Sequence, residues 1–219
     1  MFEQTAATAQ RENWSWESFL LELLEAEPVP DSSNRGMEGR RERRIQRLTQ
    51  ASHLPEGKTL ETFDLDRLPL RLRRQLPNLT RGDFIDRNEN ILVFGLPGTG
   101  KTHLVAALAY EWIQANYAVL FTPTFKLVGT LLRAKRDYEL ERELRRLDRF
   151  NVVILDDLGY VQQSREEMEV LFTFLAERYE RRCVVITSKL PISSFPNGIR
   201  YSRIHSPRQP PLIAWYITV

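Results

Sequence analysis

The stretch GLPGTGKT, residues 95–102, decides the fold class of this chain. It follows the apolar run ILVF at residues 91–94 and precedes apolar residues at helical spacing. Glycines at 95, 98 and 100 let backbone N–H groups curl around an anion without interference from Cβ atoms. A strand, a loop of this spacing and a helix in that order predict a phosphate-binding site.

Each position of the loop has an expected role. Lys101 supplies positive charge to the β- and γ-phosphates, and Thr102 offers a hydroxyl to Mg²⁺. The helix that begins here aims its first N–H groups at the same phosphates. The residues expected to contact a bound nucleotide are Gly95, Pro97, Gly98, Thr99, Gly100, Lys101 and Thr102.

A second group of candidate residues ends another apolar strand, VVIL at residues 152–155. Asp156 and Asp157 follow that strand directly, as in the acidic partner motif of phosphate-binding loops. Asp156 is expected to complete the Mg²⁺ shell that Thr102 begins, and Asp157 to activate a water molecule. The alternative is that both acids only cap the following turn.

The pattern beyond residue 88 alternates strands with helices. Strands are expected at residues 91–94, 118–121, 152–155 and 183–187, and helices at 101–115, from 123 and at 164–181. Thr122 and Pro123 resemble a helix cap followed by a first helical proline, and Ser164 with Glu167 fits a capping box. This alternation predicts an α/β fold with a parallel sheet between two layers of helices.

Composition excludes several other classes of protein. In 219 residues no run of about eighteen apolar residues occurs, and the N-terminus lacks the pattern of a signal peptide. We therefore expect a cytoplasmic protein that does not enter a membrane. Cys183 lies in an apolar run, which favours a buried, inert thiol, and the three scattered histidines argue against a zinc site.

The N-terminal part has a polarised charge. Residues 1–34 carry seven acidic residues and one arginine, whereas residues 35–47 carry six arginines and two glutamates. We expect a helix near residues 16–27, a loop at 31–36 and an arginine-rich helix ending near His53. That basic helix either follows a nucleic-acid backbone or presents a solvated face.

At this point the sequence resembles the IstB-like ATPases, AAA+ relatives of the DnaC-type helicase loaders. The resemblance rests on GLPGTGKTHL, VVILDDLGY and ITSKLP, and runs from about residue 14 to about residue 194. It implies a P-loop AAA+ core that binds ATP and Mg²⁺, and a homo-oligomer that acts on double-stranded DNA with a cognate transposase. From the helix and loop signals we expect a helical N-terminal appendage at residues 1–60, followed by the AAA+ core at 61–194 and a tail of different character at 195–219.

The chain departs from the family pattern at two places. Lys189 stands where the family carries an asparagine that senses the γ-phosphate; lysine can bind phosphate but cannot accept a hydrogen bond from water. The tail at residues 195–219 has no Asp, Glu or Lys and four prolines. It lacks the family's trans-acting arginine, last strand and lid.

The tail is best explained by a change of reading frame. Codons can be chosen for residues 195–203 and 212–218 that, read two nucleotides on, spell PKWDTIFK and ADRLVHH, both family segments. The nucleotide sequence tests this hypothesis. We expect residues 212–219 either to replace the missing last strand in the order 5-1-4-3-2 or to leave an aggregation-prone edge.

Three functions fit the sequence. The first is an ATP-dependent helper of transposition with impaired hydrolysis, and the second is a DnaC-type replicative helicase loader. The third is a frameshifted remnant that binds nucleotide without hydrolysing it. A small-molecule kinase is disfavoured because the chain shows no acceptor site. Contacts to the adenine are expected from residues 63–87.

Overall fold

The computed structural model describes residues 32–160, 164–189 and 214–218. The chain divides into two compact units, residues 1–44 and 45–219, with the boundary inside helix α3 (Ser32–Ser52). The loop predicted at residues 31–36 is wrong from Ser32 onward, because the helix already includes these residues. The two glycines of this stretch, Gly36 and Gly39, weaken a helix without ending it. The helix predicted near residues 16–27 lies outside the described residues.

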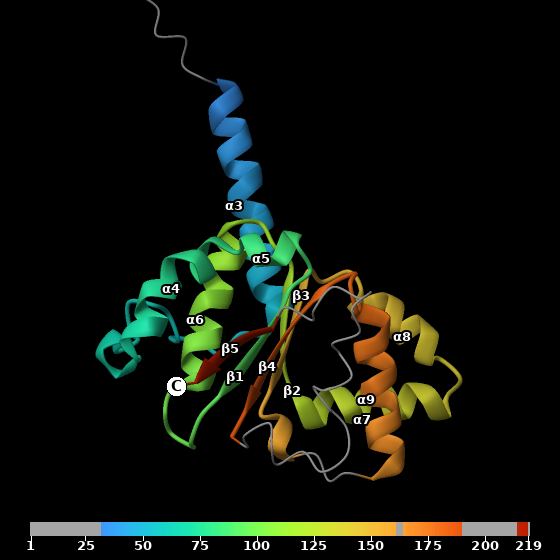
Figure 1. Ribbon diagram of the computed structural model, residues 1–219. Helices are drawn as coiled ribbons and strands as arrows, with labels where there is room; N and C mark the ends of the chain where they lie inside the picture. The colour runs from blue at the N-terminus through green and yellow to red at the C-terminus, as the bar shows by residue number, and fades with distance from the viewer. Residues whose placement is uncertain (1–31, 161–163, 190–213, 219) are drawn as a thin grey trace, which may run out of the picture. The chain divides into compact units, whose positions relative to one another are not determined.

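A five-stranded parallel sheet forms the centre of the second unit, in the order β2-β3-β4-β1-β5 (Figure 1). Each neighbouring pair of strands is parallel. This order is the predicted one, 5-1-4-3-2. The strands are β1 (Asn90–Phe94), β2 (Val119–Pro123), β3 (Val152–Asp156), β4 (Cys183–Ser188) and β5 (Ala214–Thr218).

Helices cover both faces of the sheet, which confirms the predicted three-layer architecture (Figure 1). One face carries α4 (Leu70–Arg81), α5 (Asp83–Asp86) and α6 (Lys101–Gln114). The other carries α7 (Thr124–Arg136), α8 (Leu140–Leu147) and α9 (Arg165–Arg178). Two short 3₁₀ helices complete the described elements, η1 (Leu65–Arg67) and η2 (Leu158–Tyr160).

The strands are apolar throughout because both of their faces are buried. Along β1, Ile91 and Val93 belong to the core under α6, whereas Leu92 packs against the core under α7 and α9. Along β3, Val152 and Ile154 alternate in the same way with the residues that follow them. Side chains that alternate between two covered faces are typical of parallel sheets.

The local helix signals have mixed outcomes. The capping box of Ser164 and Glu167 is present at the start of α9, as predicted. The predicted cap at Thr122 is wrong by one position: Thr122 still belongs to β2, and Pro123 itself precedes the first helical residue. Proline remains compatible with this place because its missing N–H is not needed there.

The tail adds the fifth strand. Residues 214–218 pair with β1 in parallel, with Asn90 opposite Ala214 and Phe94 opposite Thr218. Of the two expected outcomes for the tail, replacement of the last strand is therefore the one found. The strand closes the edge of β1 that would otherwise present unpaired backbone groups.

The side chains of Cys183 and Arg178 are buried beside the sheet, and Cys183 belongs to the core under α6. Cys183 is a free, fully buried thiol whose pKa is raised by burial, as expected for an inert cysteine. Arg178, 2% exposed, donates hydrogen bonds to the carbonyl oxygens of Leu147, Phe150 and Cys183. Burial lowers the pKa of its guanidinium to about 10, and the charge of nearby Asp148 partly opposes this shift.

Within the described residues, no helix has the length and apolar character that a bilayer crossing requires.

Candidate functional site

The glycine-rich loop connects β1 to α6, as the sequence predicts. Gly98 and Gly100 have φ of 80° and 94°, in the left-handed region that favours glycine. Gly100 is the residue before α6, and its carbonyl accepts the first helical hydrogen bond, from Leu104 N at 2.8 Å. The Thr99 hydroxyl donates to the Leu96 carbonyl at 2.9 Å, and Pro97 is exposed. The loop thus ends at a helix N-terminus, where anions are stabilised.

The Lys101 side chain bends back over this loop. Its Nζ donates to the carbonyl oxygens of Gly95 at 2.8 Å and Leu96 at 2.7 Å. Burial lowers the pKa of the ammonium, while the charges of Asp157 and Asp156 act in the opposite direction. The positive charge is therefore held at the mouth of the loop, facing the two acids.

Thr102 and Asp156 meet as predicted, although 54 positions separate them in the sequence. The Thr102 hydroxyl lies 3.0 Å and 3.2 Å from the two carboxylate oxygens of Asp156. Thr187 Oγ1, from the end of β4, donates to Asp156 Oδ1 at 2.7 Å. Parallel strands place their carboxyl ends at one edge of a sheet, which brings these three residues together.

Asp157 has an unusual backbone and an unsatisfied side chain. Its φ is 55°, and its N–H donates to Thr187 Oγ1 at 2.9 Å. Within the described residues, its buried Oδ1 has no hydrogen-bond partner. A non-glycine residue at positive φ with an orphaned carboxylate oxygen is typical of functional sites.

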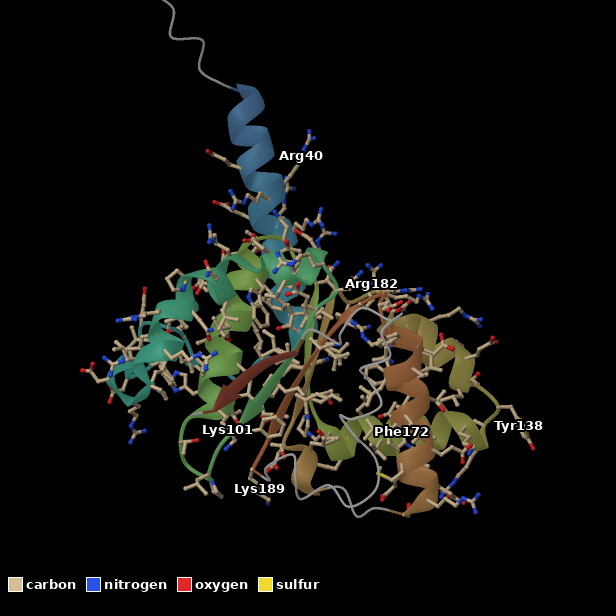
Figure 2. The ribbon with its side chains drawn as sticks, viewed as in Figure 1. Arg40, Lys101, Tyr138, Phe172, Arg182 and Lys189 are labelled. Atoms are coloured by element: carbon tan, nitrogen blue, oxygen red, sulfur yellow. The ribbon has the colours of Figure 1, made fainter. Side chains whose placement is uncertain are left out.

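Lys189 enters the site from the end of β4. Its Cε lies 3.3 Å from the position that a Cβ on Gly159 would occupy, and Asp157 Oδ1 lies 3.6 Å from the same point. Figure 2 shows Lys101 and Lys189 at the same end of the sheet. The missing side chain of Gly159 leaves space in which Lys189 and Asp157 approach each other.

The residues present fit a magnesium ion bound together with a nucleotide. Mg²⁺ in such sites is held by a hydroxyl, one or two carboxylates, phosphate oxygens and water. Thr102 and Asp156 supply the first two, and the orphaned Oδ1 of Asp157 lies beside them. Among the described residues, no cluster of three or more His, Cys, Asp or Glu could hold a metal without a nucleotide.

Two residues beside the site, Thr187 and His103, carry no prediction from the sequence, and Phe63 is predicted only as the first residue of the range 63–87 expected to contact adenine. Thr187 links Asp156 to Asp157, although Lys189 is the only predicted site residue in the run TSK that contains it. Phe63 packs against Gly100, with ring atom Cε2 3.1 Å from the position of a Cβ there. His103 lies edge-on to Phe63, with ring centroids 5.1 Å apart. Their positions in the sequence give the only signal: His103 directly follows the phosphate-binding loop, and Thr187 lies at the end of a predicted strand.

The chain is similar to a known protein family and to known proteins of insertion sequences. A family profile described as "IstB-like ATP binding protein" matches residues 1–200. The chain is 39% identical to an insertion sequence ATP-binding protein of Sinorhizobium fredii, over 89% of this chain and 63% of that protein. It is also 39% identical to an insertion sequence IS21 ATP-binding protein of Pseudomonas aeruginosa, over 68% and 57%. The chain thus spans less than two thirds of the length of either relative.

A solved structure shows the same fold. The replication initiator DnaA bound to AMPPCP and single-stranded DNA superposes with a TM-score of 0.60 at 17% identity, over 77% of this chain and 52% of that one. The fold is that of the P-loop AAA+ proteins. With the family profile covering most of the sequence, the chain belongs to the IstB-like family of ATP-binding proteins.

Proposed function

We propose that this protein binds Mg-ATP at the site described above and acts as an ATP-dependent, DNA-associated helper of transposition. The observation that carries the proposal is the hydrogen-bonded set of Thr102, Asp156 and Thr187 facing Lys101. The family's ATP-binding description and its relatives from insertion sequences support the cellular setting.

The roles follow from the contacts. Lys101 Nζ exchanges its two loop carbonyls for the β- and γ-phosphate oxygens, which are stronger partners for an ammonium. The Thr102 hydroxyl and the Asp156 carboxylate hold the magnesium ion, with Gly95, Pro97, Gly98, Thr99 and Gly100 forming the loop around the phosphates. When bound, Mg²⁺ neutralises charge that develops on the transferred phosphoryl group.

Hydrolysis is proposed to be slow. Asp157 Oδ1 can accept a proton from an attacking water, but its side chain is shorter than the glutamate common in AAA+ proteins. Lys189 contacts the γ-phosphate, and its ammonium cannot accept a hydrogen bond from that water. These two features favour the third of the functions considered above, a protein that binds ATP without hydrolysing it.

Nucleotide affinity is the first test. Lys101→Ala removes the phosphate-binding charge, and we expect the Kd for Mg-ATP in equilibrium titration to rise at least about tenfold. Lys135→Ala is the matched control, because Lys135 lies in the last turn of α7, at the opposite end of that helix from Thr124, which contacts Asp156. An unaltered protein that binds no Mg-ATP would overturn the proposed function.

Steady-state hydrolysis with and without double-stranded DNA separates the two candidates. Turnover that DNA stimulates supports an active helper, whereas binding without turnover supports the non-hydrolysing protein. Lys189→Asn restores an amide that can accept and donate. We expect it to raise turnover, and unchanged hydrolysis would exclude Lys189 as the limiting residue.

Helix α3 is the proposed contact for the DNA backbone. At about 100° per residue, Arg40, Arg43 and Arg44 share one face of the helix, and Glu38 and Glu42 lie on the opposite face. All five side chains are exposed, and Figure 2 labels Arg40 on this helix. A face that carries three arginines and no acid suits a polyanion, even though Arg41 lies about 60° from Glu38 on another side of the same helix.

Salt dependence tests that contact. We expect a variant with Arg40→Gln, Arg43→Gln and Arg44→Gln to bind duplex DNA more weakly. The slope of log K against log salt should become shallower by about 2 to 3, since each phosphate contact contributes roughly 0.9. A variant with Glu38→Gln and Glu42→Gln should keep the slope. An unchanged slope in the arginine variant would show that this face of α3 is solvated and does not contact DNA.

The partner and the oligomer are also proposals. We expect ATP and duplex DNA to promote a homo-oligomer, measurable as a mass increase in sedimentation velocity. We also expect binding to a cognate transposase. Binding to the replicative helicase in its place would favour the helicase-loader function.

A further inference from the structure

Residues 57–64, which precede η1, form a loop tied together by threonines. Thr62 Oγ1 donates to the Gly57 carbonyl at 2.8 Å and accepts from Thr59 N–H at 3.0 Å. Gly57 has a φ of 73°, which turns the chain at the start of this loop. The loop therefore has a defined shape although it contains neither helix nor strand.

His103 attaches this loop to the first turn of α6. Its Nε2 lies 3.2 Å from the Thr59 carbonyl oxygen and 3.1 Å from Thr62 Oγ1. A carbonyl oxygen only accepts, so Nε2 carries the proton and donates to both. Because 44 and 41 positions separate the partners, these contacts hold two distant parts of the chain together.

The attached loop reaches the phosphate-binding loop through Phe63. Phe63 is 7% exposed, and its Cε2 lies 3.1 Å from the point where a Cβ on Gly100 would stand. Its ring also meets the His103 imidazole edge-on at 5.1 Å. His103, Phe63 and Gly100 thus form one packed contact beside the loop that receives the phosphates.

The position of this contact points to the nucleoside end of a bound nucleotide. The γ-phosphate end lies toward Asp156 and Asp157, to which Thr102 points. His103 follows Thr102 on the helix and is turned from it by about 100°. A nucleoside continues from the opposite end of the phosphates, and the contact of Phe63 with Gly100 holds residues 57–64 beside the loop from which it would extend.

We infer that His103 is a positioning residue that holds residues 57–64 against α6 so that they form a wall for the nucleoside of the bound nucleotide. This inference rests on the proposed nucleotide binding and assigns a function to contacts that the phosphate site does not use. His103 does not touch the phosphates; it acts through Thr59, Thr62 and Phe63.

A comparison of two ligands tests this role. Tripolyphosphate offers the phosphate contacts of ATP without a nucleoside. His103→Leu keeps apolar bulk but removes the donor, and we expect the Kd for Mg-ATP to rise about tenfold, as the loss of two hydrogen bonds implies. The Kd for Mg-tripolyphosphate should stay within about twofold, since its contacts lie elsewhere.

Two further variants exclude a merely structural effect. His103→Gln places an amide N–H at a similar reach and should restore most of the ATP affinity. Thr62→Val removes the acceptor and should reproduce the loss seen in His103→Leu, and the double variant should add little to either. Circular dichroism melting shows whether each variant is folded, and Thr62→Val provides the test should His103→Leu unfold.

Three results would overturn the inference. One is an unchanged ATP affinity in His103→Leu and Thr62→Val. Another is an equal loss for ATP and tripolyphosphate, which would assign His103 to the phosphate loop or to the fold. The third is a failure of His103→Gln to recover affinity. If the unaltered protein binds neither ligand, the proposed function itself fails, and the inference fails with it.

Discussion

At the scale of single residues, Thr187 fixes the arrangement of the two acids. Successive residues of a strand normally point to opposite faces. Here the strand ends at Asp156, and Asp157 turns away with positive φ while its N–H is held by Thr187. The same hydroxyl donates to Asp156, so one side chain holds the carboxylate of Asp156 and the backbone of Asp157.

Thr187→Val tests that role because valine keeps the shape of threonine without its hydroxyl. We expect the affinity for Mg-ATP to fall several-fold, and the unfolding free energy by about 1–3 kcal/mol, since the buried Asp157 N–H loses its partner. Titrations with ATP at several Mg²⁺ concentrations measure the first and urea unfolding the second.

A matched substitution gives the control for this prediction. Thr173→Val removes an exposed hydroxyl that only bonds within α9, and it should leave ATP affinity unchanged. A Thr187→Val protein that binds Mg-ATP like the unaltered chain, with the same dependence on Mg²⁺, would mean that the acids position themselves without it.

At the scale of elements, two glycines differ in whether the structure requires a glycine at their position. Gly100 precedes α6 with φ of 94° and faces Phe63 at close distance. Gly129 lies inside α7 with nothing within 4 Å of an added Cβ. The first is required by the phosphate loop, whereas the second only weakens its helix.

The two glycines therefore predict opposite shifts in stability. Gly129→Ala should stabilise the protein by about 1 kcal/mol, the difference in helix propensity. Gly100→Ala should destabilise it by about 1–3 kcal/mol and weaken nucleotide binding, because alanine is strained at this φ and meets Phe63. Urea unfolding of both variants measures the shifts; destabilisation of equal size in both would contradict this account.

The sequence allowed correct prediction of most elements and of the pairing between Thr102 and Asp156. Both follow from local patterns: apolar runs mark the strands, and parallel strands bring their carboxyl ends together. The contact of His103 with Thr59 and Thr62 could not be predicted, because it depends on the path of an irregular loop far away in the sequence. The Thr187 bridge likewise requires the register of β3 against β4.

At the scale of the whole molecule, the tail determines whether the sheet is complete. Residues 214–218 form the only described partner of β1 on the side away from β4. The segment differs in composition from the rest of the chain, so its pairing depends on backbone hydrogen bonds and a general preference of β-branched and aromatic residues for strands.

Removal of residues 212–219 should therefore expose β1 as an open edge. We expect the shortened protein to melt at a lower temperature and to form concentration-dependent aggregates, because unpaired strand edges recruit other chains. Removal of Val219 alone is the control, since β5 ends at Thr218. Melting followed by circular dichroism, together with sedimentation velocity, measures both effects. If the shortened chain keeps its melting temperature and stays monodisperse, β5 contributes nothing to the core, and the four strands from β1 to β4 form a self-sufficient sheet.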